Sequence, residues 1–387
     1  MLSSVFLFYS LCFAACQATV LDCSPGDPAC TPGATLLLYQ IKDDSVCSRL
    51  MGGTIQECLP TGLTGTVTHF AGTVGTNGYV DGFGTAAQFE NPNGITTDVT
   101  FVYVADRANH VIRRIDPDTT EVITFAGDGT LGTNDGVGMG ARFNQPIDLT
   151  SDGTYIYTAS PNSYRIRRIE IATRTVTTFA GNATNMVIDG TGTSASFSGP
   201  AGITTDGTSL FVTEGLDHVI RKIDISTAVV TTFAGTVSTP GTVDGVGSSA
   251  QFNVPVGITT DGTALYVADN TGGVLRKIDM ATASVSTLAG SGAMATIDGI
   301  GTAAAFNIPS RVLLDGTYNV SENQGHVIRR IDPDSVEVST YTGMVGTTST
   351  ADGTGTAAGF NTPDGITFTG EALFVSDTFN RTIRKIE

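Results

Sequence analysis

The sequence predicts an all-β fold, a six-bladed β-propeller built from four-stranded antiparallel blades. One pattern recurs six times, with repeats that open near residues 67, 122, 176, 230, 285 and 338. A period of 53 to 55 residues is typical of propellers and solenoids. The composition agrees, because only 15% of residues are charged and glycine is abundant, which suits many short strands joined by turns.

The strands of one blade can be placed from the clearest repeat, which begins at Val230. VGITTD, entered through a proline, is expected to form the innermost strand, and ALYVAD and VLRKID the second and third. The next repeat opens with VSTLAG, which is expected to be the fourth and outermost strand of this blade. These runs are rich in β-branched residues and are separated by Asp-Gly or Asn/Gly turns.

The two ends of the repeat region are expected to complete one blade together. An outer strand at about 66–71 has no blade before it, and the last repeat stops after its third strand. Pairing 66–71 with the C-terminal strands at about 372–386 would close the ring and remove the exposed sheet edges. We therefore assign residues 66–387 to one closed propeller.

The residues before the propeller are predicted to direct secretion. Residues 1–18 combine an apolar run with small residues at its end, which is typical of a signal peptide. FAAC, ending at Cys16, loosely resembles a lipoprotein cleavage box, so a lipid anchor there is an alternative. We expect a secreted, extracellular protein, or one in the periplasm or on the cell surface if the source is bacterial.

Residues 19–65 form a short cysteine-rich segment that is separate from the repeats. Its four cysteines are Cys23, Cys30, Cys47 and Cys58. An even number of cysteines after a signal peptide favours two disulfides, for which we expect the pairs Cys23–Cys30 and Cys47–Cys58. A zinc site is the alternative. The apolar run ATLLLYQI in this segment needs a surface to pack on, either this propeller or another chain.

Charge argues against nucleic acid as a partner, because the net charge is −17. Most basic residues occur as one dyad per repeat, followed two residues later by Asp or Glu: Arg113-Arg114, Arg167-Arg168, Arg221-Lys222, Arg276-Lys277, Arg329-Arg330 and Arg384-Lys385. We interpret each dyad as part of a repeated structural ion pair, with a basic binding stripe as the alternative. N-glycosylation triplets occur at Asn182, Asn319 and Asn380.

The long polar loop of each repeat carries the pattern DG-x-G-xx-A-x-F. Its aspartates are Asp81, Asp135, Asp189, Asp244, Asp298 and Asp352. We expect them to form Asx turns or helix caps, and Ca²⁺ binding is the alternative. Its phenylalanines, which we expect to fill the gaps between blades, are Phe89, Phe143, Phe197, Phe252, Phe306 and Phe360.

The repeated pattern TFAG…DGxGxxAxFNxPxGIttD…LYVAD…NHVIRRID closely resembles the NHL repeat family over about 320 of the 387 residues. This resemblance implies a propeller, but it does not imply one activity. Similar propellers include extracellular adhesion modules, ligand-binding domains, and a few enzymes such as amidating lyases and lactonases.

No catalytic set can be assigned from the sequence. His110, His218 and His326 occupy one repeat position in alternate blades, so they cannot converge on a metal and are expected to be turn residues. His69 lies on the outermost closing strand, which leaves a lyase-type zinc site without its ligands. Nucleophile-elbow, Walker and haem motifs do not occur either.

One group of residues departs from the repeat near the expected axis. Asp148 and Arg311 replace the glycine of the Pro-x-Gly-Ile template in blades two and five, which face each other. Asn93 and Asp364 occupy the x position in blades one and six. These four residues are the candidate axial pocket for a small polar ligand or cation. The alternative is sequence drift in which the arginine neutralises the carboxylates.

Two functions follow from these observations. The first is a secreted, non-catalytic propeller that acts as a protein-interaction or assembly module through its loop face or its N-terminal segment. The second is a metal-assisted, lactonase-like hydrolase, or a small-ligand binder, that uses the axial residues. We favour the first, with no cofactor expected and Ca²⁺ as the possible exception.

Overall fold

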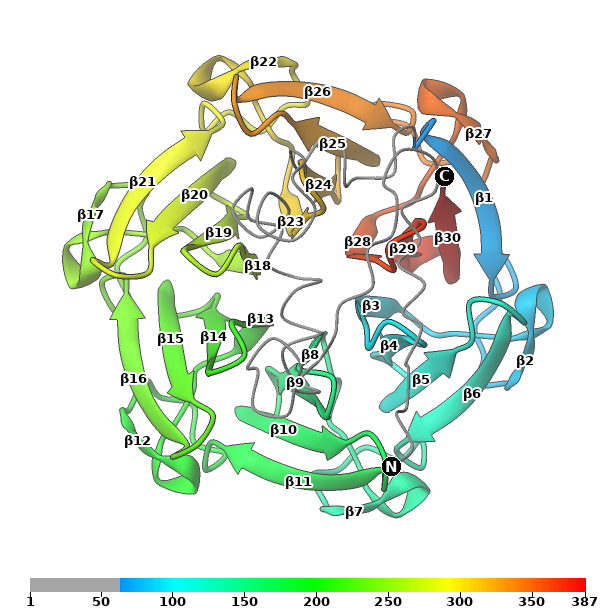
Figure 1. Ribbon diagram of the computed structural model, residues 1–387, viewed down its shortest axis with the longest axis horizontal. Coiled ribbons are helices and arrows are strands. Elements are labelled where there is room, and N and C mark those ends of the chain that lie inside the picture. Colours follow the sequence, from blue (N-terminus) through cyan, green and yellow to red (C-terminus); the bar gives the residue numbers. More distant parts are fainter. Residues whose placement is uncertain (1–62) are drawn as a thin grey trace, which may run out of the picture.

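Six antiparallel sheets surround a central axis and form the six blades of a β-propeller (Figure 1). The structure is a computed structural model that describes residues 63–387. The predicted signal peptide, the four cysteines and the lipid-anchor position all lie in residues 1–62, outside the described residues. Within residues 63–387, no helix is long and apolar enough to cross a membrane.

The first three blades are given from the innermost strand to the rim. Blade one contains β3 (Pro92–Thr97), β4 (Val102–Asp106), β5 (Val111–Ile115), β6 (Glu121–Ala126) and β2 (Gly82–Phe83). Blade two contains β8 (Asp148–Ser151), β9 (Tyr155–Ser160), β10 (Arg165–Glu170), β11 (Thr175–Ala180) and β7 (Gly136–Val137). Blade three contains β13 (Pro200–Thr205), β14 (Ser209–Glu214), β15 (Val219–Asp224), β16 (Val229–Ala234) and β12 (Gly190–Thr191).

The other three blades follow the same order. Blade four contains β18 (Pro255–Thr260), β19 (Ala264–Asp269), β20 (Val274–Asp279), β21 (Ser284–Ala289) and β17 (Gly245–Val246). Blade five contains β23 (Pro309–Leu314), β24 (Tyr318–Glu322), β25 (Val327–Ile331), β26 (Glu337–Thr342) and β22 (Gly299–Ile300). Blade six contains β28 (Pro363–Phe368), β29 (Leu373–Asp377), β30 (Thr382–Ile386), β1 (Thr66–Ala71) and β27 (Gly353–Thr354).

The propeller is confirmed, but each blade has five strands rather than the predicted four. The fifth strand comes from the DG-x-G loop, whose two residues pair with the start of the outer strand, as Gly82 does with Val122. A 3₁₀ turn follows each of these short strands: η2 (Gly84–Ala86), η3 (Gly138–Gly140), η4 (Gly192–Ser194), η5 (Gly247–Ser249), η6 (Gly301–Ala303) and η7 (Gly355–Ala357). A further one, η8 (Thr378–Asn380), precedes β30. A strand of two residues, the first of them a glycine, is too short to show strand periodicity in the sequence.

The predicted ring closure is confirmed. β1 pairs antiparallel with β30, with Val67 opposite Ile386 (Figure 1). The backbone N–H of Thr66 also donates to the carbonyl oxygen of Glu387 at 3.0 Å. The first and last described strands therefore complete the same sheet.

The core consists of six clusters, each of which lies between two neighbouring blades. The cluster around Phe89, for example, joins Ile95 and Val104 of blade one to Phe374 and Ile383 of blade six. The six loop phenylalanines are fully buried, as predicted. They contribute to the clusters between blades because the loop that carries them returns from the rim to the next inner strand.

The two ends of the propeller differ in what they carry. At one end, which we call the loop face, long loops join each outer strand to the next blade, and shorter loops join second strands to third strands. At the other end, the turn face, tight turns join first strands to second strands and third strands to fourth strands. The strand directions place both kinds of loop on the same end of all six sheets.

Candidate functional site

The first arginine of each dyad is buried, and both of its terminal nitrogens donate hydrogen bonds to the surrounding chain. Arg276 is typical: Nη2 donates to Asp244 at 2.8 Å and to the carbonyl oxygen of Val243 at 3.2 Å. Its Nη1 donates to the carbonyl oxygen of Gln251 at 2.7 Å and to Asp269 at 3.4 Å. The guanidinium also lies 5.1 Å from the centre of the Phe252 ring.

The loop aspartates are the outer partners of these arginines, so the prediction that they form Asx turns or helix caps is wrong. The pairs are Arg113–Asp81, Arg167–Asp135, Arg221–Asp189, Arg276–Asp244, Arg329–Asp298 and Arg384–Asp352. In blades one to five, the acidic residue two positions after the dyad accepts hydrogen bonds from its own turn, as Asp279 does from Thr282 at 2.8 Å, and only Glu387 pairs with its dyad, through Lys385. A Ca²⁺ ion in a DG-x-G loop would have to share the carboxylate with a guanidinium.

A second, fully buried acid meets the same arginine in five of the six blades. These acids end the second strand, and they are Asp106, Glu214, Asp269, Glu322 and Asp377. Blade two has Ser160 at this position. Burial raises the pKa of Asp269 to about 7 and that of Asp106 to about 6, and the neighbouring arginines and hydrogen bonds only partly offset it.

The three repeated histidines join blades in pairs. Nδ1 of His110, His218 and His326 accepts a hydrogen bond from a backbone N–H of the next blade, at 3.3, 3.1 and 3.1 Å. Each has a left-handed backbone, with φ between 57° and 61°. Burial lowers the pKa of all three imidazoles. They are structural turn residues, as expected from their spacing.

The axis is crowded because the inner strands pack edge to edge around it. The template glycine makes this close approach possible: a Cβ atom on Gly202 would lie 2.0 Å from the carbonyl oxygen of Val256 in the next blade. A Cβ atom on Gly257 would lie 2.3 Å from the Ser310 carbonyl oxygen. The two positions without this glycine, Asp148 and Arg311, therefore introduce side chains into the crowded centre.

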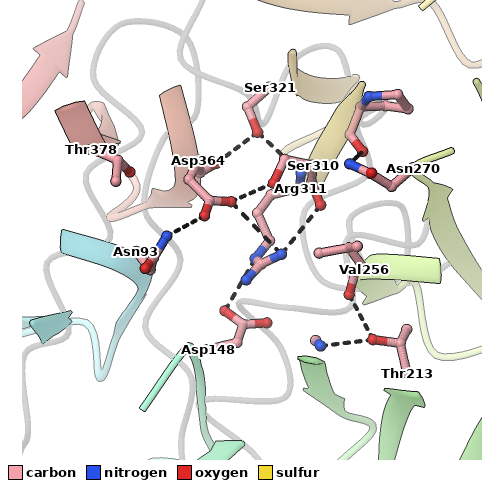
Figure 2. A network of polar contacts seen from close by, with 12 residues as sticks. Asn93, Asp148, Thr213, Val256, Asn270, Ser310, Arg311, Ser321, Asp364 and Thr378 are labelled. Carbon is pink, nitrogen blue, oxygen red and sulfur yellow. Dashed lines mark hydrogen bonds and ion pairs between the residues drawn. The ribbon is translucent and has the colours of Figure 1, made fainter. Parts of the chain in front are cut away.

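All four predicted axial residues lie together (Figure 2). Arg311 extends from β23 across the axis to Asp148 of the opposite blade, with 3.4 Å between Nε and Oδ1. Its Nη1 lies 3.7 Å from Oδ1 of Asp364. The amide of Asn93 donates to the other oxygen of Asp364. A three-residue ion cluster thus connects blades two, five and six, and Asn93 joins it to blade one.

Sequence reasoning missed the hydroxyl groups that support this cluster. Ser310 donates to the carboxylate of Asp364. Ser321 donates to the Asp364 backbone carbonyl oxygen at 2.6 Å and accepts from the Arg311 backbone N–H at 3.0 Å. In blade three, Thr213 links Gly202 to the next blade in the same way. A signal existed, because Thr213 and Ser321 replace the alanine of the LYVAD pattern.

The cluster is buried but incompletely satisfied. Arg311 is only 5% exposed, yet its Nε and Nη2 have no hydrogen-bond partner, and neither has Oδ1 of Asn93. Burial raises the pKa of Asp148 even though Arg311 opposes this shift. Burial alone would lower the pKa of Arg311, but Asp148 and Asp364 outweigh it and raise that pKa.

The axial residues do not fit the metal site of a lactonase-like hydrolase. The guanidinium of Arg311 occupies the position between the two carboxylates, where a cation would have to bind. Residues 63–387 contain no group of three or more His, Cys, Asp or Glu side chains that could hold a metal ion. The groups that remain available to a ligand are two hydrogen-bond donors on Arg311, Nε and Nη2, and one acceptor on Asn93, Oδ1.

Comparison with known proteins agrees with the repeat pattern. No family model matches the chain. It is 28% identical over 282 residues to protein SUPPRESSOR OF QUENCHING 1, chloroplastic, of Arabidopsis thaliana, covering 67% of this chain and 27% of that protein. It is 27% identical over 306 residues to human NHL repeat-containing protein 2, covering 68% of this chain and 42% of that protein. The chain thus spans less than half the length of these relatives.

Solved structures share the fold at low sequence identity. An auxiliary nutrient binding protein from Bacteroides thetaiotaomicron superposes with a TM-score of 0.64 at 18% identity, covering 83% of this chain and 76% of that one. A protein of unknown function from the same organism gives 0.64 at 19% identity, with 83% and 75% covered. At these identities the likeness concerns the fold alone.

Proposed function

Because the chain is an NHL-type β-propeller, we propose that it is a secreted, non-catalytic module that binds a protein partner through its loop face. The observation that carries the proposal is a ring of exposed apolar side chains on that face, one from each loop that leaves an outer strand: Val74, Leu131, Met186, Val237, Met294 and Val345. Their exposed fractions lie between 42% and 56%. Single exposed apolar residues are ordinary, but one within three to six residues of the end of every outer strand forms a ring on this face.

Two further apolar residues extend this ring toward the axis. Leu216 and Phe379 are 65% and 54% exposed, and they lie in the short loops of blades three and six, on opposite sides of the face. Exposed aromatic and aliphatic side chains surrounded by polar loop residues are typical of protein-binding surfaces. An auxiliary nutrient binding protein shares this fold, which is compatible with a binding module here.

We place the protein outside the cell, at the cell surface or in the periplasm if the source is bacterial. The support is the signal-like run in residues 1–18 and the cysteine cluster in residues 19–65. The apolar run ATLLLYQI of this segment would add a second contact for a partner or for another copy of the chain.

A photo-crosslinking amino acid introduced at single positions of the full chain tests the loop face. Met186 on the loop face and Val99 on the turn face are both exposed, so they make a matched pair of positions. We expect one defined protein adduct from Met186 in the native secretion medium and none from Val99. Equal adducts from both positions, or adducts from Val99 alone, would contradict the proposal.

Self-assembly is tested separately by the solution mass of the mature chain, before and after removal of residues 19–64. Loss of an oligomer on trimming would assign assembly to the cysteine-rich segment. A monomer in both forms at high concentration would rule out the assembly version and leave a different protein as the partner.

A small-ligand site at the axis is the second candidate, and one observation favours it. Arg311 Nη2 and Asn93 Oδ1 are a buried donor and a buried acceptor without partners, and such groups are costly unless something satisfies them. A neutral amide carries both matching groups, whereas an anion would meet Asp148 and Asp364. Acetamide should therefore raise the melting temperature of the native chain but not that of Asn93→Ala. Equal shifts in both proteins, or no shift in either, would remove this candidate.

A further inference from the structure

The three N-glycosylation triplets of the sequence differ sharply in their surroundings. We propose that Asn182 carries an N-linked glycan and that Asn319 and Asn380 do not. The proposal rests on the secretion proposed above, because the modifying transferase acts on chains that enter the secretory route. The glycan would be a covalent addition at a site that the propeller leaves free.

Two of the three asparagines lie inside the fold. Asn319, on β24, is fully buried, and its Oδ1 and Nδ2 contact Arg330 and Thr317, each at 3.4 Å. Asn380 is 6% exposed, and its Nδ2 donates to the Ser349 carbonyl oxygen at 2.7 Å and to Asp377 at 2.8 Å. A sugar on either side-chain nitrogen would overlap the packed residues of the blade, so the folded chain cannot carry a glycan at Asn319 or Asn380.

Asn182 lies on the loop face, between β11 and β12, in a run of exposed residues. Its Oδ1 accepts from the backbone N–H of Thr184 at 2.9 Å and from Ser196 Oγ at 2.8 Å. Both contacts use the oxygen, so the side-chain amide is oriented with Nδ2 away from them. No hydrogen bond of Nδ2 is found within the described part of the chain. Asn182 is an exposed residue, and so are Ala183 and Thr184, the other two residues of the triplet.

The reaction transfers an oligosaccharide from a lipid diphosphate donor. Nδ2 forms the bond to the anomeric carbon, while the bond from that carbon to the phosphate oxygen breaks. The lipid diphosphate leaves with the electron pair, and the amide proton passes to a base of the transferase. Asn182 keeps its carbonyl oxygen, so the hydrogen bonds from Thr184 and Ser196 remain possible after transfer.

The test is the intact mass of the full chain secreted by eukaryotic cells, measured before and after peptide-N-glycosidase treatment. We expect the enzyme to remove one glycan from the wild-type chain. Asn182→Gln and Thr184→Ala should abolish this mass change, and Thr184→Ser, which keeps the triplet, should preserve it. An unglycosylated wild-type protein in the medium, or a mass change that persists in Asn182→Gln, would overturn the proposal.

The same experiment separates this proposal from the proposed secretion. One version of the chain begins with its own residues 1–18, and a second carries a host secretory leader in their place. Retention of the first version alone counts against secretion by the native leader. The second version reports on Asn182 in either case, because it enters the secretory route independently of those residues.

Discussion

The arginines at the blade interfaces and the arginine on the axis are all buried, but they differ in how many hydrogen-bond partners the chain provides. Arg276 donates from both terminal nitrogens to two backbone carbonyl oxygens and two carboxylates. Arg311 has two ion pairs of 3.4 and 3.7 Å but a single backbone carbonyl partner, and its Nη2 has no hydrogen-bond partner. The interface arginines thus fix the loop that enters each blade to that blade's own strands, and only their Nε lacks a partner, whereas the axial arginine also has a terminal nitrogen without one.

The largest effect is expected from removing an interface arginine. Arg221→Leu would leave Glu214 buried without its cation, and breaking such a buried pair costs about 3–5 kcal/mol of unfolding free energy. Urea denaturation measures this loss. Lys222→Leu, at the more exposed second position of the dyad, is the control and should cost less than about 1 kcal/mol. Equal losses of unfolding free energy in the two variants would show that the stabilisation does not depend on burial of the arginine.

A smaller effect is expected when only the inner acid is removed. Asp269→Ser copies blade two, where Ser160 takes this position and Arg167 keeps its outer partner, Asp135. Because Arg276 would keep Asp244, we expect a loss of about 1–3 kcal/mol in urea denaturation, mostly from the unsatisfied hydrogen-bonding groups.

The pH dependence of this loss has a definite sign. The pKa of Asp269 in the folded chain, about 7, lies above its unfolded value, so its stabilisation is present at low pH and fades as pH rises through about 7. The difference between wild type and Asp269→Ser should therefore be larger at pH 5 than at pH 8. A difference that grows with pH would mean that Arg276 holds this carboxyl charged.

The histidine contact between blades is an intermediate case, with one acceptor on a half-buried ring. His218→Tyr copies Tyr164 of blade two and removes the hydrogen bond from Val254, which contributes about 0.5–1.5 kcal/mol. The pKa of His218 is lowered, so its contribution is present above about 6.5 and is lost as pH falls. The penalty measured by urea denaturation should shrink from pH 8 to pH 5, opposite to Asp269→Ser. An equal loss of unfolding free energy at pH 8 and pH 5 would argue against the imidazole as the hydrogen-bond acceptor.

The smallest effect is expected at the axis when the repeat is restored. Asp148→Gly, Arg311→Gly and Asp364→Ala together give the three charged positions residues that other blades carry there, and because no unpaired buried charge is left we expect a change of only about 1 kcal/mol. Arg311→Gly alone is the control, and it should cost more because it leaves Asp148 and Asp364 without a cation. If the triple variant loses as much stability as Arg221→Leu in urea denaturation, the proposed difference between the interface arginines and the axial arginine is wrong.

Repetition explains why so much of this molecule could be predicted. Six copies of one pattern determined the blade number, the main strands and the buried phenylalanines, and the unpaired strand at 66–71 indicated the closure. The axial residues were found for the same reason, since a departure such as Arg311 is visible only against a constant template. Their convergence then followed from the facing positions of blades two and five.

The arginine partners could not be read from the sequence because strand geometry and distance conceal them. The acid nearest to the dyad, Asp279, lies three residues after Arg276, and an odd offset places two side chains on opposite faces of a strand. The true outer partner, Asp244, is 32 residues away in a loop. Only the path of that loop along the rim brings the two side chains together.

The closure between β1 and β30 determines how the ring would respond to a pulling force. Val67 lies opposite Ile386, and the two strands run antiparallel from this point, so both ends leave from the same end of the ladder. A force applied between residues 63 and 387 would load the hydrogen bonds one after another, as in unzipping, and not all at once in shear. Tension along the chain would therefore open blade six first, while the other five sheets, each made of consecutive strands, still hold together.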